Sequence, residues 1–169
     1  MAFTAADVKK LREMTGVGMM DCKNALKETD GDFDKAIEHL REKGLAKAAK
    51  KAGRIAAEGM VCAKVCPECG VGGIIEVNSE TDFVAKNADF QKFVSDLAAV
   101  VMQQNPADVD ALKACQMDGQ TVEAALQEKV LTIGENIQIR RFARYDDSTV
   151  NVSYTHAGGV IGVLVALRV

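Results

Sequence analysis

Residues 79–103 read SETDFVAKNADFQKFVSDLAAVVMQ. Aromatic and aliphatic residues recur in this stretch at intervals of three, four and seven residues, which is the period of one face of an α-helix. The apolar positions are Phe83, Phe90, Phe93, Leu97 and Val101. We therefore predict one long helix whose apolar side faces a core, and the segments around it indicate what that core contains.

The segments that flank this helix alternate between apolar and polar residues, as half-buried strands do. Upstream, residues 60–65 and 73–78 predict a hairpin that closes through a turn rich in Pro, Gly and Cys. Downstream, the pattern predicts short helices at 105–115 and 121–131, and strands at 135–146, 149–156 and 160–169. Together these elements indicate an α+β fold with antiparallel strands and packed helices.

The first part of the chain has the period of helices only. Residues 4–43 predict three short helices, the first with a capping box between Thr4 and Asp7 and the third capped by Asp32. We expect the third helix to end near Gly44. Residues 45–58 are rich in Ala and Lys, so a separate, exposed linker helix is predicted there.

The composition limits the classes of protein to consider. Of 169 residues, 48% are apolar and 27% are charged, with no Trp, which predicts a globular chain with an aliphatic core. Residues 1–59 carry 12 Lys and Arg against 10 Asp and Glu, a net charge of +2, whereas residues 60–169 carry 9 against 14, a net charge of −5. A charge of +2 is too small for strong attraction to nucleic acid.

Nothing in the sequence indicates export or a membrane. The N-terminal residues are charged from Asp7 onward, which is unlike a signal peptide. No apolar run reaches the roughly 18 residues that a membrane-spanning helix needs. Five cysteines without a secretion signal favour reduced thiols. We therefore expect a cytoplasmic protein without a membrane partner.

The motifs of common enzymes do not occur in the sequence. The dipeptide Gly-Lys of phosphate-binding loops is missing, and so is the HExxH motif of zinc proteases. The two histidines are His39 and His156, and we interpret His39 as a surface residue of the third helix. We therefore expect no enzyme, no catalytic residue and no cofactor.

Cys62, Cys66 and Cys69 are candidate metal ligands because they lie within eight residues. A Cys-x-x-Cys pair in a turn supplies two of the four ligands that zinc prefers. No fourth ligand is near in the sequence, so Cys115 or Cys22 would have to fold back. Free thiols in a hairpin turn are the alternative.

Three segments each have a structural and a functional interpretation. Residues 41–54 contain six Lys and Arg and one Asp or Glu, and they form either a solvated linker face or a nucleic-acid-binding strip. Met19 and Met20 form either an adaptable protein-contact patch or part of a small core. Phe83 either packs in the core or projects from the strand-to-helix corner as an aromatic anchor for a partner.

Five blocks of the chain resemble one protein family. They are LREMTGVGMMDCKNAL at 11–26, AAKKAGRIAAEG at 48–59, EVNSETDFVAKN at 76–87, IGENIQIRR at 133–141 and YTHAGGVIGVLVA at 154–166. In this order they resemble bacterial translation elongation factor Ts, over nearly the whole chain. Longer members of that family continue past the last residue of this chain, so we expect a C-terminally truncated form.

The resemblance implies a division of the chain into parts. It implies an N-terminal three-helix module of the ubiquitin-associated type at 1–44, a basic linker helix at 45–58, a first core subdomain at 59–139 and a partial second core subdomain at 140–169.

The resemblance also implies an activity, guanine-nucleotide exchange on the GTPase elongation factor Tu. Arg12, Met19, Met20 and Lys23 match contacts to the nucleotide-binding domain of that partner. Asp82 and Phe83, with Thr81 and Val84 beside them, match a wedge near its magnesium and phosphate site. His156 matches a contact to another domain of the partner.

Two other functions remain as alternatives. One is a nucleic-acid-binding protein that uses residues 41–54, although the resemblance implies no direct contact with nucleic acid. The other is a small zinc-binding protein that uses Cys62, Cys66 and Cys69. The sequence leaves open whether the chain forms a homo-oligomer.

Overall fold

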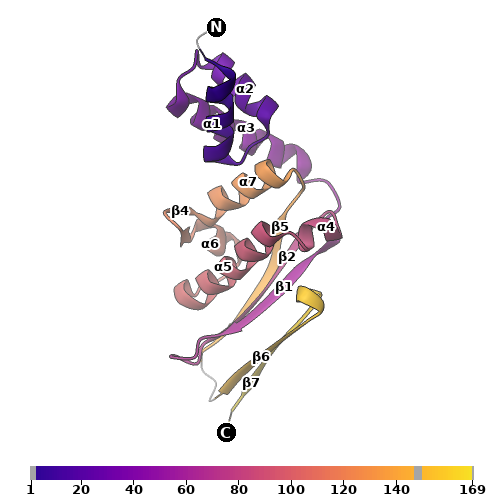
Figure 1. Cartoon of the computed structure of the whole chain (residues 1–169). Coiled ribbons are helices and arrows are strands. Elements are labelled where there is room, and N and C mark those ends of the chain that lie inside the picture. Colours follow the sequence, from indigo (N-terminus) through magenta and orange to yellow (C-terminus); the bar gives the residue numbers. More distant parts are fainter. Residues whose placement is uncertain (1–2, 147–149, 169) are drawn as a thin grey trace. The chain divides into compact units, whose positions relative to one another are not determined.

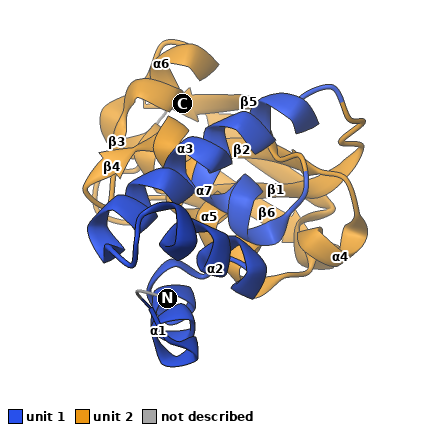
Figure 2. Cartoon of the chain, turned by 90° about the horizontal axis from the view of Figure 1, so that it is seen from above, with its two compact units in different colours: residues 1–53, 127–135 blue, residues 54–126, 136–169 orange. Residues whose placement is uncertain are grey.

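The computed structural model describes residues 3–146 and 150–168. The chain divides into two compact units, which Figure 2 shows in different colours. Unit 1 comprises Met1–Gly53 and Gln127–Glu135, and unit 2 comprises Arg54–Leu126 and Asn136–Val169. Helices and antiparallel strands occur together, which confirms the predicted α+β class.

Unit 1 contains the helices α1 (Ala5–Thr15), α2 (Met19–Glu28) and α3 (Phe33–Lys51). The predicted capping box is present at α1, where the Asp7 N–H donates to Thr4 Oγ1 at 3.3 Å and the Thr4 N–H donates to Asp7 Oδ2 at 2.7 Å. The core of these helices is aliphatic, with the side chains of Leu11, Leu26 and Leu40 buried together.

The sequence predicted that the third helix ends near Gly44. Helix α3 instead continues to Lys51. A Cβ atom on Gly44 would lie 3.2 Å from the Cδ2 atom of Leu131. The glycine therefore allows close approach of another segment and does not stop the helix. The separate linker helix predicted over 45–58 is wrong, because residues 45–51 belong to α3 and the first strand begins at Glu58.

Unit 2 is built on a sheet with the strand order β1 (Glu58–Val65), β2 (Gly72–Ser79) and β5 (Gln138–Tyr145). The predicted hairpin is confirmed, since β1 and β2 pair antiparallel. Strand β5 pairs antiparallel with β2, with a bulge between Glu76 and Val77. The boundary predicted between residues 139 and 140 falls inside β5, and the division into subdomains stays a prediction.

Both faces of this sheet are covered. Helix α5 (Ala88–Gln104) lies along one face, and the hairpin of β6 (Val150–His156) and β7 (Ile161–Leu167) lies along the other (Figure 1). Two neighbouring glycines of β2 show how close the layers are. A Cβ atom added to Gly73 would lie 2.6 Å from Met102 of α5, and one added to Gly72 would lie 2.9 Å from Leu164 of β7.

The other predicted elements are confirmed, with bounds that differ by a few residues. Helices α6 (Val109–Ala114) and α7 (Val122–Ile133) occupy the two segments predicted as short helices. The strands predicted at 149–156 and 160–169 are β6 and β7, and residues 149 and 169 themselves lie outside the described part. Three short elements were not predicted: the two-residue strands β3 (Gln116–Met117) and β4 (Gln120–Thr121), and the 3-10 helix η1 (Ala157–Gly159).

The long helix predicted from Phe83 to Val101 is wrong at its start. A short helix, α4 (Asp82–Ala85), ends before α5 begins. The side chain of Asn87 starts α5 by accepting hydrogen bonds from the N–H groups of Asp89 and Phe90, at 2.8 and 3.2 Å. From Phe90 onward the predicted apolar face is buried. Phe83 precedes the break and is 81% exposed.

His39 also differs from its interpretation as a surface residue. Its side chain is half-buried on α3. Within the described part of the chain, its Nε2 atom is buried without a hydrogen-bond partner.

Candidate partner-binding site

Phe83 lies at the corner where the central strand β2 passes into α4. Ser79, the last residue of β2, is fully buried, and its hydroxyl donates to the Thr81 carbonyl at 3.0 Å. The Thr81 hydroxyl then caps α4 by accepting the Val84 N–H at 3.4 Å. Consecutive residues on a helix point about 100° apart, and here Val84 points inward, 8% exposed, while Phe83 points outward.

Val84 is buried, and its predicted contact with the partner stays a prediction. The resemblance placed Val84 beside the partner-binding residues, but its side chain packs in the core of unit 2. Thr81 is half-buried and engaged as the helix cap. These two residues therefore hold the corner in shape, and Phe83 is the side chain that the corner presents.

Asp82 is paired within its own helix. Its carboxylate lies 2.6 Å from the ammonium of Lys86, one helical turn later. Hydrogen bonding to Lys86, followed by its positive charge, lowers the pKa of Asp82, and the same contact raises the pKa of Lys86. Both side chains are exposed, so the pair is open to exchange with a partner's charges.

A second set of contacts fastens the start of this corner to distant parts of unit 2. The carboxylate of Glu80 accepts the Asn136 N–H at 2.7 Å and lies 3.5 Å from the Arg54 guanidinium. The Asn136 side chain, 3% exposed, donates to the Arg54 carbonyl at 2.8 Å. On the other side, Gln91 of α5 donates to the Ala85 carbonyl at 3.2 Å. These bonds brace the corner from both ends.

No sequence pattern pointed to Glu80 or Asn136, and Arg54 was considered only as part of the basic stretch 41–54. Their contacts join residues 26, 56 and 82 positions apart, which no local pattern reveals. The sequence did contain a signal that a new helix starts after α4. Asn87 followed by Ala88 and Asp89 is typical of a helix N-terminus.

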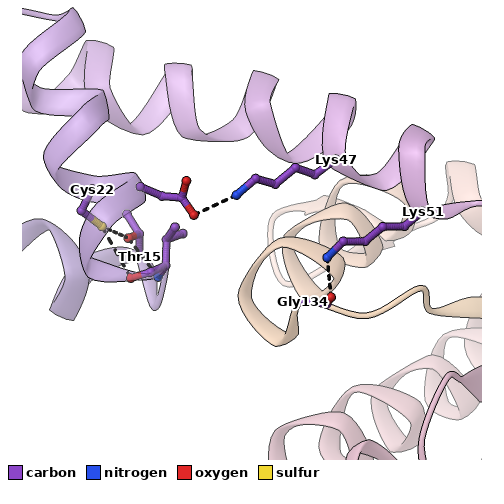
Figure 3. Close-up of polar contacts among 7 residues, drawn as sticks. Thr15, Cys22, Lys47, Lys51 and Gly134 are labelled. Atoms are coloured by element: carbon purple, nitrogen blue, oxygen red, sulfur yellow. Dashed lines mark hydrogen bonds and ion pairs between the residues drawn. The ribbon is translucent and has the colours of Figure 1, made fainter.

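In unit 1, Met19 and Met20 begin helix α2, and both are exposed, at 41% and 65%. Of the two interpretations, the exposed contact patch agrees with this geometry and the core does not. The loop before them is fixed by hydrogen bonds: Thr15 Oγ1 donates to the Leu11 carbonyl at 2.8 Å, and Cys22 Sγ donates to the Val17 carbonyl at 3.5 Å. Thr15 Oγ1 also lies 3.8 Å from Cys22 Sγ (Figure 3). Burial raises the pKa of the Cys22 thiol.

The charged residues predicted beside this patch are exposed as well. Arg12 lies on α1 and Lys23 on α2. Met14, on α1, is another exposed apolar side chain of unit 1, at 57%.

His156 ends strand β6 and is exposed. Its Nδ1 atom is 2.9 Å from the Tyr154 hydroxyl. Register places His156 opposite Ile161 and Tyr154 opposite Val163, so these side chains share the outer face of the hairpin. That face is apolar along its length, and each of its apolar residues is at least 42% exposed: Val150, Val152, Tyr154, Ile161, Val163, Val165 and Leu167.

The three cysteines of the β1–β2 hairpin do not form one cluster. Cys62 is half-buried within β1, whereas Cys66 and Cys69 lie in the turn after it. Within residues 3–146 and 150–168, no group of three or more His, Cys, Asp or Glu side chains could hold a metal ion. Among the same residues, no helix is both long and apolar enough to cross a membrane.

The basic stretch at 41–54 is partly occupied by contacts within the chain. Lys47 lies 2.8 Å from the carboxylate of Asp21, and Lys51 donates to the carbonyl of Gly134 (Figure 3). Arg54 pairs with Glu80 at the Phe83 corner. Three of its six cations therefore have partners in the protein itself, which favours a structural role for the stretch over a nucleic-acid strip.

Comparisons with known proteins agree with the resemblance found in the sequence. The family model described as Elongation factor TS matches residues 80–169. Elongation factor Ts of Alkalilimnicola ehrlichii is 53% identical over 168 residues, which are 99% of this chain and 58% of that protein. The same factor of Trichlorobacter lovleyi is 53% identical over 169 residues, covering 98% of this chain and 54% of the relative.

A third relative, elongation factor Ts of Roseobacter denitrificans, is 55% identical over 171 residues, covering 98% of this chain and 57% of its own length. The chain thus spans little more than half the length of these curated relatives. The matches place it among the translation elongation factors. Within that class it belongs to the elongation factor Ts family.

Proposed function

We propose that the chain promotes the release of guanine nucleotide from the GTPase elongation factor Tu. Phe83 is the residue that enters the partner near its magnesium and phosphate site, with Asp82 beside it. Arg12, Met19, Met20 and Lys23 bind the nucleotide-binding domain of the partner, and His156 binds another domain. In this role the chain acts by binding a protein and not as an enzyme.

One observation carries this proposal: Phe83 is 81% exposed on a corner that is fixed by hydrogen bonds on both sides. A large apolar side chain in water is unfavourable unless it is buried elsewhere. Because the backbone at the corner is already ordered, little conformational entropy is lost when the ring enters a partner. An exposed aromatic on a rigid support is typical of a binding hot spot.

The mechanism is a coupling between two binding equilibria. A factor that binds the nucleotide-free GTPase more tightly than the loaded form weakens nucleotide binding by the same ratio. Burial of one Phe supplies roughly 1.5–3 kcal/mol, which is about one to two powers of ten in an equilibrium constant. Phe83 alone is therefore a modest contribution, and the contacts of Met19, Met20 and His156 add to it.

The experiment is the release of a fluorescent GDP from elongation factor Tu, with and without the full chain. We expect the chain to accelerate release and the Phe83→Ala variant to lose about one to two powers of ten of that acceleration. The matched control is Ile55→Ala, which removes another apolar side chain of unit 2 that is 86% exposed. This control should exchange as the parent chain does.

Two results would contradict the proposal. One is the absence of acceleration together with the absence of binding to the GTPase in a pull-down or calorimetric titration. The other is an equal loss in the Phe83→Ala and Ile55→Ala variants, because a general loss of exposed apolar surface would then explain the effect.

A further inference from the structure

The turn between β1 and β2 holds two cysteines close together. Cys66 donates its N–H to the Val71 carbonyl at 2.8 Å, and its own carbonyl accepts the Gly70 N–H at 2.9 Å. Gly70 takes a φ of +72°, a conformation that favours glycine. The chain therefore reverses direction tightly over Cys66-Pro67-Glu68-Cys69-Gly70, and both cysteines lie in this reversal.

The two cysteines interact directly. The Cys69 N–H donates to the Cys66 sulfur at 3.4 Å. A hydrogen bond from the Cys69 thiol, together with the N–H groups of Cys69 and Glu68, lowers the pKa of the Cys66 thiol. Burial instead raises the pKa of Cys62 and of Cys22. Cys69 is exposed and Cys66 half-exposed, so reagents in solution reach the pair.

We propose that Cys66 and Cys69 form a reversible dithiol–disulfide site that reacts with low-molecular-weight disulfides of the glutathione type. Among the residues that the structure describes, no third ligand joins Cys66 and Cys69 in a group that could hold a metal ion. Zinc requires four, whereas Cys62 is four residues away along an extended chain, on the order of 13 Å. A disulfide requires two sulfurs, which is what the turn provides.

The reaction is a thiol–disulfide exchange in two steps. The Cys66 thiolate attacks one sulfur of the small disulfide, forming a Cys66 mixed disulfide and releasing one small thiolate. The Cys69 thiolate then attacks the Cys66 sulfur, closing the Cys66–Cys69 bond and releasing the second small thiolate. The protein dithiol loses two electrons, the small disulfide gains them, and the two protons of the protein thiols pass to the two released thiolates.

The test uses the reduced full chain, incubated with oxidised glutathione near neutral pH and then treated with an alkylating reagent. Peptide mass mapping should find one disulfide, between Cys66 and Cys69, with the other cysteines alkylated. In the absence of glutathione, Cys66 should be alkylated about tenfold or more faster than the buried Cys22, because the thiolate is the reactive form.

Three variants separate the two steps. Cys69→Ser should stop after the first step and accumulate a mixed disulfide with glutathione on Cys66, whereas Cys66→Ser should remain mostly unmodified. The control Cys62→Ser should form the Cys66–Cys69 disulfide as the parent chain does, and circular dichroism checks that each variant is folded. A disulfide to Cys62, faster modification of Cys69 than of Cys66, or zinc retained in stoichiometric amount on this turn would overturn the proposal.

Discussion

Phe83 and Phe90 are seven residues apart, yet the first is 81% exposed and the second is fully buried. We expect Phe83→Ala to change the free energy of unfolding by less than about 0.5 kcal/mol, as exposed substitutions do. Phe90→Ala should lower it by about 3–5 kcal/mol, because it leaves a cavity in the core. Urea unfolding of both variants measures the contrast. A large loss for Phe83→Ala would show that its ring packs in the core.

Asp7 makes the stability of helix α1 depend on pH. Hydrogen bonds from the backbone and then the hydroxyl of Thr4 lower the pKa of this carboxyl below its ordinary value of 3.8. A folded-state pKa below the unfolded one stabilises the fold above the unfolded value, and this stabilisation is lost as the pH falls through the folded value. Asp7→Asn should therefore lower the melting temperature at about pH 7. Below about pH 4, the difference in melting temperature between this variant and the parent chain should become smaller.

Thermal melts across this pH range measure the effect. Asp30→Asn is the control, because Asp30 lies in the turn between α2 and α3 and takes a φ of +51°, which Asn also tolerates. A gap between Asp7→Asn and the parent that stays constant down to acid pH would contradict the assignment of the capping box.

At the scale of elements, the pairing of β1 with β2 depends on a glycine. Gly59 lies opposite Asn78 in the ladder and has a φ of +132°. A Cβ atom there would lie 2.2 Å from the Val77 carbonyl oxygen. Gly59→Ala should therefore lower the free energy of unfolding by about 3 kcal/mol or more, through strain and the displaced strand.

The matched control for this substitution is Gly53→Ala, where an added Cβ meets nothing within 4 Å. We expect that control to shift the free energy of unfolding by less than about 1 kcal/mol. Equilibrium unfolding in urea compares the two. Equal effects at both glycines would mean that the ladder tolerates a side chain at position 59.

Local sequence patterns predicted most of these elements and failed at two helix ends. The strands β1, β2, β5, β6 and β7 lie where the alternation of the sequence predicted them. Burial alternates clearly in β7, because one face of the β6–β7 hairpin packs against the sheet and the other is exposed. Gly44 was expected to end a helix. In the structure it allows Leu131 to approach the helix closely, and because Leu131 is distant in sequence no local pattern shows this. Phe83 kept a helical spacing across a break that Asn87 imposes.

At the scale of the whole molecule, the exposed residues of the candidate site could be predicted from the sequence, whereas the contacts that support them could not. The resemblance pointed to Met20, Phe83 and His156, whose exposure agrees with a contact role. The same resemblance could not tell that Val84 is buried. Nor could it reveal that Glu80 and Asn136 brace the corner, since that contact spans 56 residues and forms only when β5 pairs with β2.

The charge of the whole chain allows the nucleic-acid alternative to be tested against the protein-binding one. The net charge is −3, and three of the six cations at 41–54 are engaged with Asp21, Gly134 and Glu80. With three phosphate contacts, the logarithm of the affinity for single-stranded RNA should fall with the logarithm of the salt concentration at a slope of about −2, whereas six contacts would give about −4.

Fluorescence anisotropy of a labelled RNA oligonucleotide over a series of salt concentrations measures this slope. We expect weak binding, a slope no steeper than about −2, and equal small losses in Lys50→Gln, within the basic stretch, and Lys27→Gln, on α2 outside it. Both lysines are exposed, so the pair is matched in charge and accessibility. The slope reports the number of cations that reach phosphate. A slope near −4, with a loss of affinity specific to Lys50→Gln, would require the cations of the basic stretch to leave their partners in the protein. That result would favour nucleic acid as the ligand of the stretch.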